Sequence, residues 1–248
     1  MAQLPNSLEE ALAQSREATL AALADGYTRL QVELVFPEIE IQAQSLAQQF
    51  IPIFEDRISQ LKVFFPDAGA AALARRDWGE VAFKIEDIGL GRSPIQNKIK
   101  PEDEVFLLVN AGGVEVAEVE KLCNAVEDRP VVLLIPHLED SIGVTGIGLA
   151  GRQLRDRFLK TLTSCYYVRA LEGGALFRCY PGLWQVYLQN GTDYNLVAEL
   201  PSKPFGDEID RILGKEMENT NAQTTEAPRP RKSGIFANMQ RFLKALSS

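Results

Sequence analysis

EVFLLVNAGGVEVAEVEKLCNAVEDRPVVLLI, residues 104–135, contains two predicted strands, at 104–109 and 131–135, which are continuous apolar runs apart from Glu104. Apolar runs of this length are typical of strands that are buried on both faces, as in a parallel sheet covered by helices. The pattern between them, over residues 114–127, predicts a helix. The segment is therefore a predicted β-α-β unit, and it indicates an α/β fold with a three-layer, Rossmann-like sheet.

The flanking sequence extends this sheet and changes its character. Ser7 and Glu10 form a capping box that begins a helix, which we expect to end near Gly26. Late in the chain, short strands follow one another, so the sheet is predicted to be mostly parallel with antiparallel strands toward its C-terminal end. The other predicted elements are strands at 30–36, 61–65, 81–85, 166–170, 175–180, 184–189 and 195–200, helices at 40–58 (broken by Pro52), 68–78, 149–162 and 205–217, and a loop at 89–101.

Composition indicates one folded α/β domain, which we place at residues 1–217. The chain has 248 residues, of which 46% are hydrophobic, and its formal net charge is −8. From residue 219 onward there are five basic residues and one acidic residue, a net charge of +4, so the preceding part carries −12. An acidic body repels phosphates, and we therefore predict no nucleic-acid partner.

The cysteine and histidine content argues against metal sites. There are three cysteines, one histidine and no CxxC pair, so we predict no structural zinc and no cofactor, and reduced thiols in a cytoplasmic compartment. The first residues, MAQLPNSLEEAL, carry acids where a signal peptide carries positive charge. No apolar run reaches the roughly 18 residues that cross a bilayer. Any association with a membrane is therefore expected to be peripheral.

The end of the chain is predicted to be a tether and a basic amphipathic helix. Residues 218–234 are rich in polar residues and proline, and we predict a disordered linker. Over residues 235–248, apolar residues follow the helical period, and basic residues lie off this stripe. Such a helix suits an anionic lipid surface or a partner protein, while packing on its own body and disorder remain alternatives. The predicted docking residues are Ile235, Phe236, Met239, Arg241, Phe242, Leu243, Lys244 and Leu246.

A glycine-rich segment provides a candidate phosphate site. Gly146, Gly148 and Gly151 satisfy the GxGxxG pattern, and Arg152 and Arg155 follow in a predicted helix. A helix N-terminus with nearby arginines suits an anion. Against this, the glycines begin about ten residues after the preceding strand, past Glu139 and Asp140, whereas a dinucleotide fingerprint follows its strand directly. The alternative is a loop with a glycine-eased entry into the helix.

Two further positions fall where α/β proteins often place ligands. Gly112 follows the strand 104–109 and precedes a helix, at the carboxyl end of a predicted parallel strand. A sharp β-to-α turn that requires glycine is the favoured interpretation, because Glu115 and Glu118 lie in the following turn, where a phosphate would approach. His137 follows the strand 131–135 near acidic residues, which suits a general base, with Ser141 and Cys165 as the remaining nucleophile candidates. A capping or surface histidine is the alternative.

Aromatic residues also allow two interpretations. Arg75 and Trp78, with Arg76 and Asp77 between them, form a candidate partner-binding spot, because Arg and Trp are frequent interface anchors. The alternative is a solvated helix end with Trp78 packed inward. The aromatic residues of the late strands are predicted to build a core: Tyr166, Tyr167, Trp184 and Tyr187.

Four stretches carry a family resemblance. They are LPNSLEEALAQSREATLAALADGYTRLQVELVFPEIE (4–40), FFPDAGAAALARRDW (64–78), RPVVLLIPHLED (129–140) and RCYPGLWQVYL (178–188). They resemble a cyanobacterial and chloroplast family of unassigned biochemical function, whose plant members include factors named for low photosystem II accumulation. The domain is also similar to an extra, non-catalytic module of a plastid adenylate kinase.

The resemblance implies a setting in oxygenic photosynthesis and supplies no catalytic residues. We therefore expect a non-enzymatic accessory or assembly and maintenance factor for a photosynthetic membrane complex. It would bind a protein client and lie peripherally on the cytoplasmic face of the thylakoid. The alternatives are a nucleotide- or phosphate-binding regulatory protein or enzyme that uses residues 146–151, and a regulatory module of a kinase-like enzyme.

Overall fold

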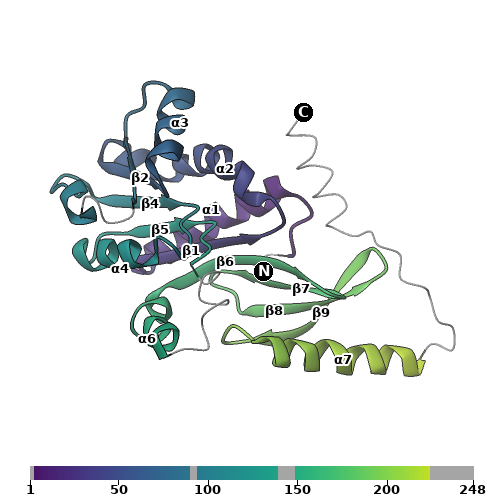
Figure 1. The fold of residues 1–248 in the computed structure, drawn as a ribbon. Helices are drawn as coiled ribbons and strands as arrows, with labels where there is room; N and C mark the ends of the chain where they lie inside the picture. The colour runs from purple at the N-terminus through teal and green to yellow at the C-terminus, as the bar shows by residue number, and fades with distance from the viewer. Residues whose placement is uncertain (1–2, 90–93, 139–148, 224–248) are drawn as a thin grey trace. The chain divides into compact units, whose positions relative to one another are not determined.

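The computed structural model describes residues 3–89, 94–138 and 149–223 and confirms a mixed α/β fold with a nine-stranded sheet (Figure 1). The chain forms two compact units. The parallel unit comprises residues 19–33 and 38–164, and the meander unit comprises residues 1–18, 34–37 and the chain from 165 onward. The antiparallel strands lie toward the C-terminal end, as predicted.

The parallel unit is built on five parallel strands in the order β3-β2-β4-β5-β1. Every residue of β2, β4 and β5 is buried, which is the burial that the uninterrupted apolar sequences of β4 and β5 predict; β2 is apolar except for Lys62. The strands are β1 (Arg29–Val35), β2 (Leu61–Phe65), β3 (Lys84–Asp87), β4 (Val105–Val109) and β5 (Val131–Leu134).

Helices cover both faces of these strands. Phe64 and Phe106 belong to a core cluster that includes Val119 on one helix, whereas the neighbouring Phe65 stacks on Trp78 of another, at 5.7 Å between ring centroids. Successive strand residues point to opposite faces, so the two helices lie on opposite sides, which gives three layers. The helical segments are α1 (Leu8–Ala24), η1 (Ile39–Gln42), α2 (Ala43–Phe50), η2 (Ile51–Gln60), α3 (Ala68–Trp78), η3 (Ile95–Lys98), α4 (Val116–Ala125), α6 (Leu149–Arg157) and η4 (Leu159–Thr161).

The strand order creates a topological switch point. From β2 the chain passes through α3 to β3 on one side, and from β4 it passes through α4 to β5 on the other side. Because α3 and α4 lie on opposite faces, the connections diverge at the carboxyl ends of β2 and β4. Ligand and partner sites of open α/β sheets lie at such points.

The meander unit is an antiparallel sheet with α7 (Gly206–Gln223) on one face. Tyr167 and Trp184 pack against Ile209 of α7. On the other side, Tyr166 stacks on Phe177, and its hydroxyl donates to Gln14 of α1, which confirms that these aromatic residues build a core. Its strands are β6 (Thr163–Leu171), β7 (Gly174–Cys179), β8 (Trp184–Asn190) and β9 (Asp193–Leu200).

The predicted capping box at residues 7–10 is largely confirmed, and so is the predicted helix break at Pro52. The Glu10 backbone N–H donates to the Ser7 hydroxyl, and the Glu10 carboxylate accepts from the Asn6 backbone, one residue before the position that a capping box predicts. The α-helix α2 ends at Phe50, and the chain continues as a 3-10 helix with Pro52 in its first turn. Proline therefore breaks the predicted helix, because it removes a backbone donor.

Several predicted boundaries were wrong. The strand predicted at 81–85 begins only at Lys84, since Phe83 packs on Trp78 instead, and residues 95–98 of the predicted loop form η3. The helix predicted to reach residue 162 ends at Arg157, because the apolar residues that follow turn into the core. Helix α7 extends to Gln223, beyond the predicted linker start at 218, since no glycine or proline interrupts residues 215–223. The remaining linker residues and the predicted helix at 235–248 lie outside the described residues.

Candidate binding site at the carboxyl edge of the parallel strands

The backbone beyond β4 and β5 is held in an unusual conformation. Asn110, directly after β4, has φ 55°, and Ile135, directly after β5, has φ 49°. Left-handed backbone is tolerated by asparagine but rare for a β-branched residue, and it costs on the order of 1–3 kcal/mol. Hydrogen bonds hold both positions: Asn110 donates to the Leu134 carbonyl at 2.9 Å, and Ile135 donates to the Val32 carbonyl at 2.8 Å. Strain of this kind clusters at functional sites.

The same edge gathers hydrogen-bond acceptors. The side-chain oxygen of Asn110 and Oε2 of Glu118, in the first turn of α4, are buried, and neither has a hydrogen-bond partner among the residues that the structure describes. The Glu115 carboxylate accepts the Gly112 backbone N–H at 2.9 Å. An unmatched buried acceptor costs about 1–3 kcal/mol, so each such group in a native protein requires an explanation, of which a ligand is one.

His137 joins this edge through its neighbours. Its backbone N–H donates to the Ala111 carbonyl at 2.7 Å, and its Nε2 lies 3.6 Å from Oε1 of Glu40 in η1. The histidine predicted to sit beside carboxylates therefore does so, but its carboxylate comes from η1, far away in the sequence. Glu139, Asp140 and Ser141 lie outside the described residues, and Cys165 is buried in the meander unit.

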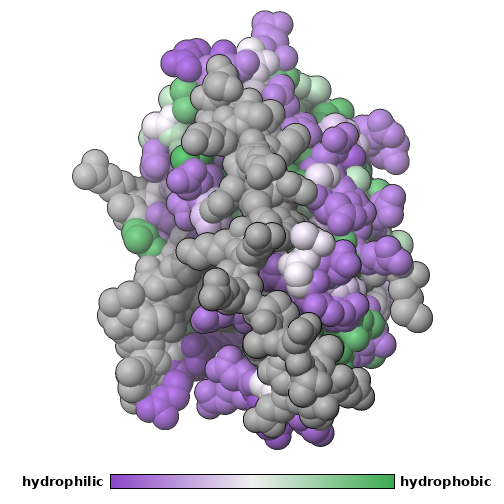
Figure 2. Space-filling view, turned by 90° about the vertical axis from the view of Figure 1, so that its right-hand side faces the viewer, coloured by the Kyte–Doolittle hydropathy of each residue, from purple (hydrophilic) through white to green (hydrophobic). Residues whose placement is uncertain are grey.

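Two exposed aliphatic side chains flank these polar groups. Ile41 follows Glu40 and is 73% exposed, and Val114 lies two residues after Gly112 and is 68% exposed. Figure 2 shows one face of the molecule, on which, outside the grey atoms, hydrophilic residues dominate and hydrophobic ones form small separate patches. Exposed aliphatic residues beside polar groups are typical of a protein-binding surface. We call Ile41, Val114, Asn110, Glu115 and His137, with Glu40 and Glu118, the carboxyl-edge site.

The glycine-rich segment is only partly described. Gly146 and Gly148 lie outside the described residues, whereas Gly151 is the third residue of α6. The third glycine of a dinucleotide fingerprint lies in the helix, so this position is compatible with the pattern. On the same helix, Arg152 is exposed and Arg155 is half-buried. A phosphate or nucleotide site here stays a prediction.

The residues around Trp78 make packing contacts within the parallel unit. Arg75 donates from Nε and Nη2 to the carbonyl of Ile85 on β3, at 3.1 and 2.5 Å. The Trp78 ring packs between Phe65 and Phe83. Arg75 thereby covers a carbonyl of a short edge strand, which protects the edge from unwanted pairing. The structure favours the packing interpretation of this cluster over the partner-binding one.

Of the carboxyl-edge site, only His137 was predicted from the sequence as a functional residue, together with the adjacent turn at Gly112. Asn110 could have been predicted from the sequence, because a polar residue that follows an apolar strand at a switch point is a candidate ligand-binding residue. Nothing in the sequence marks Glu40 and Ile41 as site residues, since their proximity to His137 arises only in the folded chain. Among the described residues, no group of three or more His, Cys, Asp or Glu side chains is placed to hold a metal ion.

The sequence profile of one protein family, the domain of unknown function DUF1995, matches residues 5–211. The chain belongs to the DUF1995 family. The DUF1995 match takes in both α/β units up to the middle of α7, and therefore the whole carboxyl-edge site. The match to the family profile does not distinguish among the individual family members that the sequence resembles.

A curated relative of this DUF1995 chain is GTPase Der from Shewanella denitrificans, which is 30% identical over 157 residues. The match includes 59% of this chain, and it spans only 31% of the length of that GTPase. No GxxxxGK[ST] sequence, the loop that cradles nucleotide phosphates in such enzymes, occurs in this chain. No solved structure matches the chain.

Proposed function

We propose that this DUF1995 protein is a non-enzymatic accessory factor that binds a protein client at the carboxyl-edge site. The observation that supports it is the pair Ile41 and Val114, the two most exposed aliphatic residues described in the parallel unit, which adjoin Glu40 and the Gly112 turn in the sequence. Small-molecule sites are concave, whereas these side chains stand out from the surface. Protruding apolar anchors with a polar surround suit a protein partner.

The acceptors indicate what the client must supply. The Glu40 carboxylate is 61% exposed, so a client gains affinity by offering it N–H or O–H donors beside its apolar side chains. The resemblance to factors of photosystem II accumulation supports a client from a photosynthetic membrane complex.

Binding of this kind depends on the two aliphatic side chains. We expect the double variant Ile41→Asp/Val114→Asp to capture at least about tenfold less client from solubilised thylakoids, measured by quantitative mass spectrometry, because a loss of about 1.4 kcal/mol is tenfold. Val81→Asp, at a less exposed aliphatic residue of the same unit, is the matched control and should capture as much as the wild type. Equal capture by the double variant and the wild type would refute this site.

The basic end of the chain supports membrane recruitment as a second part of the proposal. Residues from 219 onward carry a net charge of +4, and the stripe from Ile235 to Leu246 is apolar. Basic residues near an anionic bilayer contribute roughly 1 kcal/mol each, and apolar burial adds to this. Among the residues that the structure describes, no helix is long and apolar enough to cross a membrane.

Flotation with anionic liposomes tests the recruitment. Full-length protein should float with the vesicles, and a chain that ends at Gln223, which keeps all of α7, should stay in the soluble fraction. Raising the salt concentration should weaken flotation, since exposed charges are screened over about 10 Å at 0.1 M salt. If both chains float equally, the membrane part of the proposal is wrong.

A further inference from the structure

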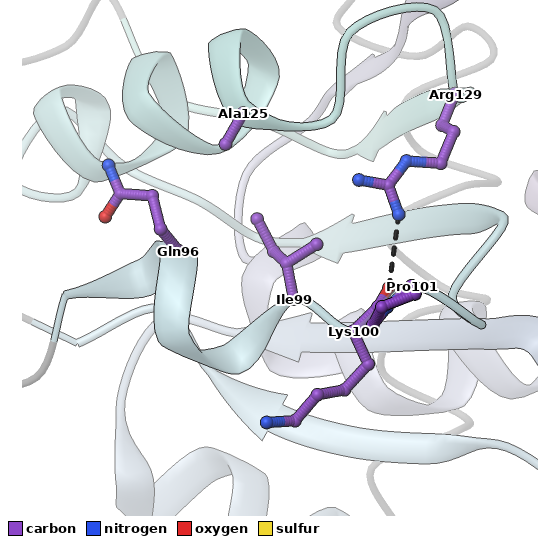
Figure 3. A pocket seen from close by; sticks show the side chains of 6 residues that line it. All are labelled: Gln96, Ile99, Lys100, Pro101, Ala125 and Arg129. Atoms are coloured by element: carbon purple, nitrogen blue, oxygen red, sulfur yellow. Dashed lines mark hydrogen bonds between the residues drawn. The ribbon is translucent and has the colours of Figure 1, made fainter.

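A cleft of about 300 Å³ lies at the opposite, amino edge of the parallel strands (Figure 3). It opens between the segment that includes η3 and the C-terminal end of α4. Its volume falls at the lower limit of ligand pockets, roughly 300 Å³. The lining residues are Gln96, Ile99, Lys100, Pro101, Ala125 and Arg129.

The guanidinium of Arg129 is held rigidly at one end of this cleft. Its Nε donates to the Val126 carbonyl at 3.2 Å, and its Nη1 donates to the carbonyls of Lys100 and Asp103, at 3.2 and 2.7 Å. The group also lies over the Phe106 ring, 5.2 Å from its centroid. These contacts use Nε and Nη1, and Figure 3 shows the other terminal nitrogen, Nη2, directed toward Ile99 and Ala125.

The remaining walls define the ligand. Ile99 and Ala125 make an apolar middle, and the Gln96 amide lies at the far end (Figure 3). The ammonium of Lys100 turns away from Arg129 and lies 3.4 Å from the Asn97 carbonyl. The nearby Asp103 carboxylate is already paired with Lys62 and Lys84, so it repels an incoming anion only weakly.

We propose that this cleft is a binding site for a small molecule with one carboxylate and a short branched aliphatic body. The carboxylate accepts an N–H of Arg129 Nη2, a charge-assisted contact. The aliphatic body covers Ile99 and Ala125, and this burial adds to the affinity. Because Arg129 is immobilised before binding, little side-chain entropy is lost when the ligand arrives. The site is separate from the carboxyl-edge site and does not depend on the proposed client.

Nuclear magnetic resonance of the isotopically labelled full-length protein tests the site, with 4-methylpentanoate as the probe and 4-methylpentanamide as its neutral analogue. We expect the carboxylate to shift the Ala125 methyl, Gln96 side-chain amide and Arg129 Nε–H signals in a saturable manner. The amide should bind at least about tenfold more weakly, because it lacks the charge that Arg129 recognises.

Substitutions on α4 localise the binding without removing the structural contacts of Arg129. Ala125→Leu fills the cleft and should weaken binding of the carboxylate at least about tenfold. Ala117→Leu adds the same bulk at an exposed position of the same helix, and its affinity should equal that of the wild type. The absence of saturable shifts, equal binding of the amide, or unchanged affinity in Ala125→Leu would each overturn the proposal.

Discussion

Replacing Lys62 with methionine is expected to lower the free energy of unfolding by about 3–5 kcal/mol, because it leaves a buried carboxylate without its counter-charge. Lys62 Nζ lies 2.6 Å from Oδ2 of Asp103, and both side chains are only 2% exposed. Lys62 also donates to the carbonyl of Lys98, and Asp103 accepts the backbone N–H of Lys100 at 2.7 Å. The pair thus fixes the segment around η3 to β2.

Denaturant unfolding measures this effect. Lys84→Met is the matched control, since Lys84 contacts the same aspartate but is 45% exposed, and its loss should be much smaller. In the double variant Lys62→Met/Asp103→Leu, both charges are gone, so much of the stability should return. If Lys62→Met lowers the free energy of unfolding no more than Lys84→Met does, the buried pair of Lys62 and Asp103 does not stabilise the fold as proposed.

The Lys62–Asp103 pair also predicts that the stability of the fold decreases at low pH. Burial alone raises the pKa of Asp103, but hydrogen bonds from Lys62 and the Lys100 backbone, with the charges of Lys62 and Lys84, hold it below its ordinary value. A lowered pKa in the folded state means that the stabilisation is fully present above the pKa of the unfolded carboxyl, about 3.9, and is lost as the pH falls through the lower folded value. In Asp103→Asn this contribution to acid sensitivity should disappear.

Gly174→Ala is expected to cost about 3 kcal/mol or more, because the added methyl group overfills the meander unit. A Cβ at residue 174 would lie 2.3 Å from the carbonyl oxygen of Tyr187 and 3.1 Å from Leu213 Cδ2. The first neighbour is backbone of β8, which cannot move without disturbing its pairing with β7. Thermal and denaturant unfolding of the two proteins measure the difference.

Gly214→Ala provides the control within the same unit. Gly214 lies in α7, and a Cβ there would meet nothing within 4 Å. Because alanine is the better helix former, this variant should be up to about 1 kcal/mol more stable than the wild type. Equal effects of the two substitutions would contradict the packing of α7 on the sheet.

The elements that could be predicted from sequence are those whose pattern reports directly on burial. The runs at 104–109 and 131–135 predicted β4 and β5 closely, because strands buried on both faces need apolar residues throughout. The short strand β3 was misplaced, since four residues with three charges carry no such pattern. Helix α7 was predicted too short, because the polar residues near its end resemble a linker.

The buried ion pair and the candidate site were harder to predict from the sequence than the fold. Lys62 lies within the apolar sequence LKVFF, and nothing local reveals that Asp103 neutralises it. The carboxyl-edge site was found only through Gly112 and His137, which follow strands directly. Glu40 and Ile41 reach it through tertiary folding, and the Asn110 acceptor is recognised only in the structure, where it is buried without a partner among the described residues.

Site-specific photo-crosslinking tests client binding most directly. A photoreactive amino acid would replace Ile41 or Val114 in the full-length protein, with Val81 as the control position, and illumination would take place with isolated thylakoids. We predict that positions 41 and 114 form adducts with the same protein of a photosynthetic complex and that position 81 does not. Adducts at 81 equal to those at 41 and 114, or no protein adduct at either site position, would contradict the account.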